Sequence, residues 1–440
     1  MKNYLHKVNW ISVIGMLLAS ATLHLLLLQI YTHHFTVNGI KTYLSLLIST
    51  NKAPDIWNHL LTYLLHFPLL IIIVFTLVML VSVLGLFFSS KPVFPLLTSA
   101  LYGGLWLSNL GRAESWLFEF LLPSLFALII AIAQWDQQLN SNTQSNWLGY
   151  KRLPTQNNKL NVFITVILLI LLSYFNFLSQ NGKEHVVAVT VLFSILTALA
   201  TYTSLTLDND RKELESSNLV RTQRTYLFLI ASSIGLMLIY QVNEDIALNW
   251  FTSEGYQNLV KIFQKTSNAP EMIISFLAHS ASISSILAPT QFIFESFAAF
   301  CLFIGVLRVP MYWLTSGLLG LLMLIEFGAP ASWPPTPTSP VNWVWELMLP
   351  TFVLIICSIH ATVEFLESKN LRQLILGNQL FSDMSLSTKA LFSITLFGIL
   401  SIAIVQSTHP EISETVLSKT LLISISLFIV MFVFDNHRKN

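Results

Sequence analysis

LLIIIVFTLVMLVSVLGLFF, from Leu69 to Phe88, is a run of twenty residues without a charged side chain. A helix needs about 20 apolar residues to cross the ~30 Å hydrocarbon layer of a bilayer. A second run, NVFITVILLILLSYFNF from Asn161 to Phe177, has the same character. Of the 440 residues, 54% are hydrophobic and 10% charged, against roughly a quarter charged in soluble domains. We therefore expect an all-α polytopic membrane protein.

Apolar segments of this kind recur along the chain and predict about 12 transmembrane helices. The first follows basic residues, as a signal peptide does. It continues to Tyr31 without a small-residue cleavage site, so we expect it to be retained. The expected spans begin near residues 9, 67, 92, 115, 160, 186, 225, 282, 309, 343, 389 and 417.

Lys and Arg are distributed unequally between the two sides of the predicted topology. With a cytoplasmic N-terminus, sixteen of the 23 lie in inner segments and seven in outer ones. Because cytoplasmic loops are enriched in these residues, both termini are expected in the cytoplasm. The net charge of +1 gives no field that would favour nucleic acid. The two cysteines, Cys301 and Cys357, lie in apolar runs without a C-x-x-C motif, which indicates buried thiols rather than a redox relay.

Short motifs of the first half recur in the same order in the second half. NKAP at 51–54 and SNAP at 267–270 are 216 positions apart. SWLFEFLLP at 115–123 and NWVWELMLP at 342–350 are 227 positions apart. The other matches are SVIGMLL with SSIGLML, FTVNG with FTSEG, and DNDRK with DNHRK. Ordered matches of this kind predict a tandem duplication.

The duplication divides the chain into a first repeat, residues 1–212, and a second repeat, residues 213–440. Six spans in each repeat keep both in the same orientation, so they are expected to be parallel repeats related by an axis along the membrane normal. Each repeat is expected to hold a four-helix bundle, at about 8–134 and 226–363, followed by two further helices.

Two outer segments add to this pattern. Between the first two spans of each repeat, apolar residues such as Leu44 and Leu47, or Ile262 and Phe263, recur at helical spacing. They predict a short helix on the outer interface. A Pro-rich stretch, Pro330–Pro340, occurs in the second repeat only, and either covers the outer face or is a stiff linker.

The fourth span of each repeat opens with a Trp, a Glu three residues later and a Pro four residues after that: Trp116, Glu119 and Pro123; Trp343, Glu346 and Pro350. Structurally, Trp belongs at the headgroup level and a carboxylate is favoured near a helix N-terminus. Functionally, the Pro lacks the N–H that would bond the carbonyl of the Glu four residues earlier. That leaves a polar notch for water, a proton or a headgroup. Both interpretations stay open.

Glu295 is the sharper candidate for a functional residue. It lies within the eighth span, where a charged group costs about 2.5–3.5 kcal/mol on insertion scales. The first repeat has Phe75 or a neighbouring apolar residue at this point. Arg308 follows at the inner end of the same span, where snorkelling to the headgroups is the simpler interpretation. Arg112, in the loop before the fourth span, is the best outer contact for an anion.

His66 and His279 fall on corresponding outer segments, one helical turn out of register. Two facing imidazoles are a weak candidate for a haem or metal site. A second His pair with the spacing of a membrane cytochrome is missing, which argues against such a site.

Residues 226–363 resemble the DoxX/DoxD superfamily of four-helix membrane proteins, which includes the small subunit of thiosulfate:quinone oxidoreductase. The similarity is carried by SNAP, by ESFAAFCLFIGVLRVP from Glu295 and by WVWELMLP from Trp343. Glu295 precedes Gly305 by ten residues, and Arg308 follows that Gly. The first repeat, at about 8–134, keeps a Gly and the Glu-x-x-x-Pro element but lacks the family Glu and Arg. The basic residue of the family's first span is missing from both repeats.

The resemblance implies a membrane subunit of a quinone-linked redox system, or an accessory to one, in the bacterial cytoplasmic membrane. Quinone is the implied cofactor. The implied partners are the lipid bilayer and another membrane or extracytoplasmic redox subunit. Glu295 and Glu346 are the implied catalytic residues. The implied quinone-binding residues are Trp343, Glu119, Trp116, Arg112 and Arg308. The outer face has few cations, which argues against thiosulfate itself as the donor.

Two other classes fit the same sequence. A 12-helix secondary transporter also has parallel six-plus-six halves, but the loop SSKPVF lacks the Gly-Asp-Arg-rich signature of the major facilitators. A membrane assembly or scaffold subunit would use its intramembrane carboxylates to pair with a partner protein. The sequence has no soluble catalytic domain and no nucleotide motif, so a complete enzyme in one chain is disfavoured.

Overall fold

The structure is a computed structural model that describes residues 9–31, 35–50, 55–89, 91–109, 117–140, 216–247, 249–266, 271–325 and 343–368. These residues form helices joined by turns, with no strand element among them, so the all-α prediction is confirmed. Eight of the expected spans fall inside the described ranges, and each coincides with a helix. The expected spans near 160, 186, 389 and 417 lie outside the described residues, as does Pro330–Pro340.

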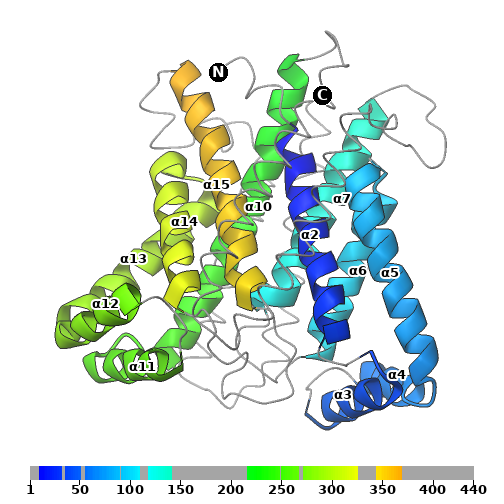
Figure 1. Ribbon diagram of the computed structural model, residues 1–440. Coiled ribbons are helices and arrows are strands. Elements are labelled where there is room, and N and C mark those ends of the chain that lie inside the picture. The colour runs from blue at the N-terminus through cyan, green and yellow to red at the C-terminus, as the bar shows by residue number, and fades with distance from the viewer. Residues whose placement is uncertain are drawn as a thin grey trace.

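The helices fall into two groups along the chain (Figure 1). The first comprises α2 (Trp10–Tyr31), α3 (Val37–Thr50), α4 (Asp55–Leu64), α5 (Pro68–Phe88), α6 (Val93–Ser108), the π-helical turn η1 (Leu117–Leu121) and α7 (Leu122–Asn140). The second comprises α10 (Ser216–Ala247), α11 (Ser253–Thr266), α12 (Glu271–Ser282), α13 (Ser284–Ile304), α14 (Arg308–Ile325) and α15 (Trp343–Ser368).

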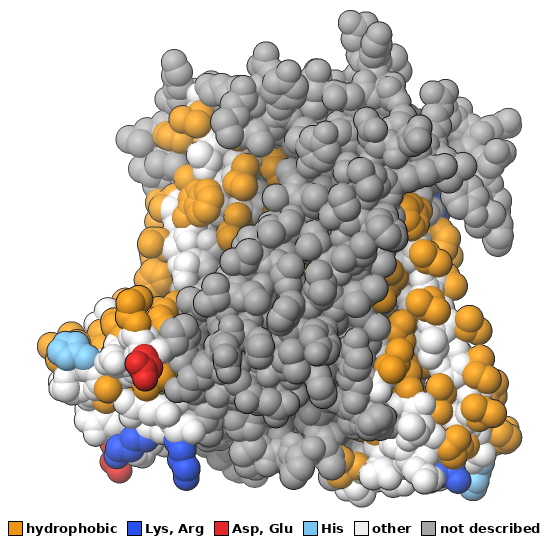
Figure 2. Space-filling model, viewed as in Figure 1, with side chains coloured by type: hydrophobic (Ala, Val, Ile, Leu, Met, Phe, Trp, Pro, Cys, Tyr) orange, Lys and Arg blue, Asp and Glu red, His pale blue; other side chains and the backbone are white. Residues whose placement is uncertain are grey.

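Three of these helices are long and apolar enough to cross a membrane: Pro68–Phe88, Ser284–Phe303 and Leu347–Leu366. Four shorter apolar helices accompany them, at Trp10–Leu26, Val93–Ser108, Glu119–Trp135 and Tyr226–Ile239. The span α5 is only partly buried inside the protein, and large apolar side chains such as Leu69, Leu77 and Leu84 are exposed along it. Figure 2 shows such hydrophobic side chains on both flanks of the molecule. A membrane, rather than water, is the solvent for this surface.

Each group closes a ring of four long helices. In the first bundle, α2 packs on α5 and α7, and α6 lies between α5 and α7. In the second bundle, α10 packs on α13 and α15, and α14 lies between α13 and α15. The two bundles meet through equivalent helices, because α2 contacts α10 and α15 while α7 contacts α10. One continuous apolar core therefore extends through both bundles.

The short helices lie crosswise at the same end of the two bundles (Figure 1). The sequence predicted α3 and α11, but not the helices α4 and α12 that follow them. The apolar residues Leu44 and Leu47 do not face the membrane as expected. They pack with Ile40 and Leu61 in a small core between α3 and α4. Hydrogen bonds from Trp57 Nε1 to Ser108 Oγ (3.1 Å) and from Asn109 Nδ2 to the Tyr43 hydroxyl (3.4 Å) fix this hairpin to α6.

The element boundaries repeat with the offset found in the sequence. Helices α3 and α11 both have 14 residues, and α5 and α13 both have 21. Helices α3, α4 and α5 begin at residues 37, 55 and 68, and α11, α12 and α13 begin 216 positions later, at 253, 271 and 284. The N-caps also match: Thr36 Oγ1 accepts from the Gly39 N–H and Thr252 Oγ1 from the Gly255 N–H, both at 3.0 Å. A Thr side chain in this position satisfies a helix donor that otherwise has no partner.

Candidate intramembrane site

Glu295 lies on α13, about midway along the candidate span Ser284–Phe303, and is only 5% exposed. The amide of Gln291, one turn earlier on the same helix, donates a hydrogen bond from Nε2 to Glu295 Oε1 at 2.7 Å. A buried carboxyl group needs partners of this kind. Moving a polar group from water into an apolar medium without a hydrogen bond costs roughly 2–7 kcal/mol. The position is therefore a polar point inside the second bundle.

The first bundle has no carboxyl group at this point. With the offset of 216, the residue equivalent to Glu295 is Met79, which is fully buried on α5. Phe75 lies one turn away from it. The matched helices thus place a thioether in one core and a carboxyl group in the other. Only the second bundle has the chemistry to bind a polar group or to exchange a proton here.

Glu295 lies close to the surface that faces the membrane. Ile293, Phe297 and Phe300 on the same helix are exposed apolar side chains. One face of α13 is thus open to lipid, while Glu295 is turned toward the bundle. A lipid-soluble molecule that lies against α13 is within a helix diameter of the carboxyl group, about 10 Å.

A close contact with α10 fixes the position of α13. Ser232 Oγ donates a hydrogen bond to the Phe303 carbonyl at 2.7 Å. A Cβ atom on Gly235 would lie 2.6 Å from Phe303 N and 2.8 Å from Ala299 O, so only a glycine allows this approach. Glycine at such a crossing is a common device for packing helices closely in membranes. The backbone that carries Glu295 is therefore held rigidly against α10.

Helix α10 carries a second pair of the same type. Gln241 Nε2 donates to Asp245 Oδ1 at 2.9 Å, and Asp245 is buried. Gln–carboxylate pairs four residues apart thus occur on both α10 and α13, which pack against each other. Asp245 and Gln291 were missed from the sequence, although the i, i+4 spacing of Gln and acid on two neighbouring spans was visible.

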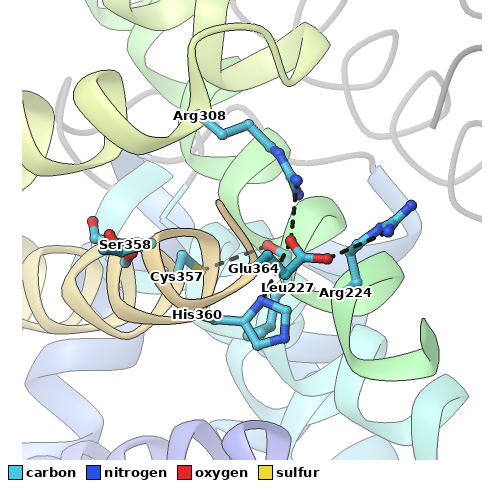
Figure 3. A network of polar contacts seen from close by, with 8 residues as sticks. Arg224, Leu227, Arg308, Cys357, Ser358, His360 and Glu364 are labelled. Atoms are coloured by element: carbon cyan, nitrogen blue, oxygen red, sulfur yellow. Dashed lines mark hydrogen bonds and ion pairs between the residues drawn. The ribbon is translucent and has the colours of Figure 1, made fainter. Parts of the chain in front are cut away.

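A second polar cluster lies where α13 turns into α14 (Figure 3). Glu364 on α15 accepts from Arg308 Nη2 at 3.0 Å and from Arg224 Nη1 of α10 at 3.3 Å. His360 Nδ1 lies 3.9 Å from the same carboxylate. These side chains are largely buried. The sequence indicated an Arg308 that extends to the headgroups, whereas its guanidinium group pairs with Glu364. Arg308 joins α10, α14 and α15 through one shared carboxylate.

The turn that presents Arg308 has an unusual backbone. Gly305 ends α13 with φ of 76°, and Leu307, directly before Arg308, has φ of 49°. A left-handed conformation costs a non-glycine residue roughly 1–2 kcal/mol. Two buried donors in this region, Arg308 Nε and the Tyr312 hydroxyl, have no hydrogen-bond partner among the described residues. Strain and unsatisfied groups of this kind persist where the surrounding packing outweighs them.

The two Trp-Glu-Pro elements adopt different local structures. Helix α15 begins at Trp343, as expected, and continues through Pro350. In the first bundle the π-helical turn η1 contains Glu119 and precedes α7, of which Pro123 is the second residue. In a π-helical turn each carbonyl accepts from the N–H five residues later instead of four. The missing N–H of Pro123 is therefore bypassed. The predicted disturbance at Glu119 is thus present as a π turn, whereas α15 remains a continuous helix.

Glu119 is buried, at the turn η1 that contacts α6, α7 and α15. It interacts electrostatically with Tyr102 of α6, whose hydroxyl lies 3.3 Å from Thr22 Oγ1 of α2. The side chains of Trp343 and Glu346 lie outside the described part of the chain, as do Arg112 and Trp116. The structure therefore describes Glu295, Arg308 and Glu119 among the expected quinone-site residues. Glu119 is in the other bundle from Glu295 and Arg308.

The two histidines proposed as a weak metal site are not brought together. His66 follows α4 and His279 lies in α12, and these segments are on opposite sides of the molecule (Figure 1). Both side chains are exposed. Within the described ranges, no group of three or more His, Cys, Asp or Glu residues is placed to hold a metal ion. Cys301 and Cys357 are free and buried, as expected.

Comparison with known proteins does not extend this description. No family model matches the chain, and no curated protein or solved structure shows significant similarity to it.

Proposed function

We propose that the chain is a tandem duplication of six spans plus six, inserted in the bacterial cytoplasmic membrane with both termini in the cytoplasm. The constant offset of 216 between α3–α5 and α11–α13 supports the duplication. The crosswise helices of both groups lie at one end of the molecule, as parallel repeats require (Figure 1). Each repeat consists of one four-helix bundle followed by two further helices.

The proposed function is that of a membrane subunit in a quinone-linked redox system. The observation that carries this proposal is the buried Glu295, hydrogen-bonded to Gln291 beside a lipid-exposed face of α13. Quinone travels in the hydrocarbon layer and takes up two electrons and two protons when it becomes quinol. A carboxyl group next to the lipid is a suitable donor or acceptor for those protons.

The two repeats have different roles in this proposal. The second bundle holds quinone at Glu295, with the Trp343 and Glu346 segment of α15 on the same bundle. The first bundle, with Met79 at the equivalent position, is a structural copy. Electrons come from a separate redox subunit or from a reduced sulfur compound bound on the outer side.

The test is quinone reduction by the purified chain in lipid vesicles, with reduced sulfur donors, alone and with any co-purifying subunit. Glu295→Gln keeps the hydrogen-bonding shape but removes the ionisable group, so donor-dependent reduction should fall by at least tenfold. Asp245→Asn is the matched control, because it removes another buried carboxyl group from the neighbouring helix α10. Equal losses in both variants would point to general damage and contradict a special role for Glu295.

Other outcomes favour the two alternative classes. A chain that reduces no quinone but co-purifies with other proteins in fixed ratio is a scaffold, and its carboxyl groups pair with those partners. A solitary chain without redox activity is better tested as a transporter, by uptake into vesicles.

A further inference from the structure

The two crosswise hairpins sort their side chains into layers. On α11, the exposed positions are polar and include Glu254, Lys261 and Lys265. Its opposite face packs onto α12, where Val260 and Leu277 share a small core. Helix α3 has the same arrangement, with exposed polar residues on one side and the small core toward α4 on the other. Helices α3 and α11 therefore cover α4 and α12 on one side.

The other side of α4 and α12 is apolar and uncovered within the described structure. On α4 and the turn after it, the exposed apolar residues recur at helical spacing: Ile56, Leu60, Tyr63 and Phe67. Ile56 is 81% exposed. On α12 and the turn after it they are Met272, Phe276 and Ile283, and Met272 is 79% exposed, while the position equivalent to Tyr63 holds the exposed His279. The positions match through the offset of 216, since Ile56 corresponds to Met272, Leu60 to Phe276 and Phe67 to Ile283.

A polar stripe runs beside each apolar stripe. It consists of Asp55, His59, Thr62 and His66 on the α4 side, and of Glu271, Ser275 and Ser282 on the α12 side, all exposed. A helix with adjacent apolar and polar stripes is typical of the boundary between headgroups and acyl chains. Water alone would leave the apolar stripe exposed to solvent, and hydrocarbon alone would bury the polar stripe without partners.

The apolar stripes continue directly into the exposed faces of the spans that follow. Leu70 and Ile73 extend the first stripe along α5, and Ile286 and Ile293 extend the second along α13. Both α5 and α13 are candidate membrane spans. Helices α4 and α12 also lie on opposite sides of the molecule (Figure 1). A single protein partner would have to be present twice to cover both, whereas a bilayer surrounds the molecule.

We propose that α4 and α12 are paired lipid-binding helices that lie in the headgroup–acyl boundary of one leaflet, on the membrane side of α3 and α11. Their partner is the phospholipid surface of the membrane that α5 and α13 cross. The exposed Lys261 and Lys265 of α11 then face the aqueous side. This inference does not depend on quinone binding. Its residues lie beside the N-terminal end of α13, opposite the end at Gly305, and outside the core of the second bundle.

The test is the accessibility of a nitroxide label in lipid vesicles, measured by electron paramagnetic resonance. Met272→Cys places the label on the apolar stripe, and Lys261→Cys is the matched control on the water-facing side of the same hairpin. The native Cys301 and Cys357 are buried, so labelling is confined to the new thiols. Oxygen, which concentrates in lipid, and a water-soluble nickel chelate are the two collision reagents.

The proposal predicts that oxygen collisions exceed nickel collisions several-fold at position 272, with the reverse order at 261. Ile56→Cys and Lys41→Cys should repeat this result on the first hairpin. A label at 272 that meets nickel more often than oxygen would place α12 in water and overturn the proposal. A label shielded from both reagents would show that protein covers the stripe, and would overturn it as well.

Discussion

Glu364 is the residue whose charge holds three helices of the second bundle together. Glu364→Gln should remove the negative charge that both guanidinium groups, of Arg224 and of Arg308, contact. Hydrogen bonds to charged groups contribute about 1.5–3 kcal/mol, so unfolding free energy should fall by about 2–3 kcal/mol. Thermal unfolding in detergent measures this change. Glu254→Gln, an exposed carboxylate on α11, is the control. Equal midpoints for the two variants would contradict the structural role.

At the residue scale, the sequence predicted some members of each site and missed their partners. Glu295 stood out because a charged residue in the middle of a long apolar run is costly in a membrane, and therefore points to a function. Glu364 did not, because it lies near the end of its span, where charged residues are common. Which cation it pairs with depends on how α10, α14 and α15 pack, and no local pattern encodes that.

At the element scale, the contact between α10 and α13 depends on one glycine. Gly235→Ala should push these helices apart, because the new Cβ would meet backbone atoms of Ala299 and Phe303. Overpacking of this kind costs typically about 1–3 kcal/mol. Gly15→Ala is the matched control: it is the corresponding glycine of SVIGMLL, and a Cβ there meets nothing within 4 Å. Alanine is the better helix former by about 1 kcal/mol, so this variant should be neutral or stabilised. The same destabilisation in both variants would argue against the close contact.

The N-caps of α3 and α11 give a second prediction for single elements. Thr36→Ala and Thr252→Ala each remove the acceptor for one helix donor, so each helix should lose about 1 kcal/mol. Amide exchange in the affected helix should then be about fivefold faster, because 1 kcal/mol corresponds to that factor. Thr42→Ala, at an exposed position within α3, should leave exchange at the helix start unchanged. Unchanged exchange in the cap variants would mean that packing alone sets the helix ends.

The elements were more predictable than their contacts. Within the described ranges, long apolar runs and the Trp at the start of α15 located the eight expected spans to within a few residues, apart from α10, which begins earlier. Helices α4 and α12 were missed because each combines an apolar and a polar stripe in only 10 and 12 residues. The apolar side chains of α3 were expected at the outer interface, because a stripe does not reveal whether lipid or another helix covers it.

At the scale of the whole molecule, parallel repeats predict that equivalent loops lie on one side of the membrane. Lys41→Cys and Lys261→Cys, one in each hairpin, should both react with a membrane-impermeant thiol reagent added outside intact cells. Both native cysteines are buried and give no background. Reaction of one position from outside and of the other only after lysis would mean opposite orientations, and would contradict the parallel arrangement.

The central claim is that quinone binds the second bundle at Glu295. Its most direct test is photolabelling of the chain in lipid with a photoreactive quinone, followed by peptide mapping. The account predicts label in 284–304, displaced by excess unreactive quinone and reduced by at least tenfold in Glu295→Gln. Label that falls equally on 68–88 of the first bundle, or that excess quinone does not displace, would contradict it.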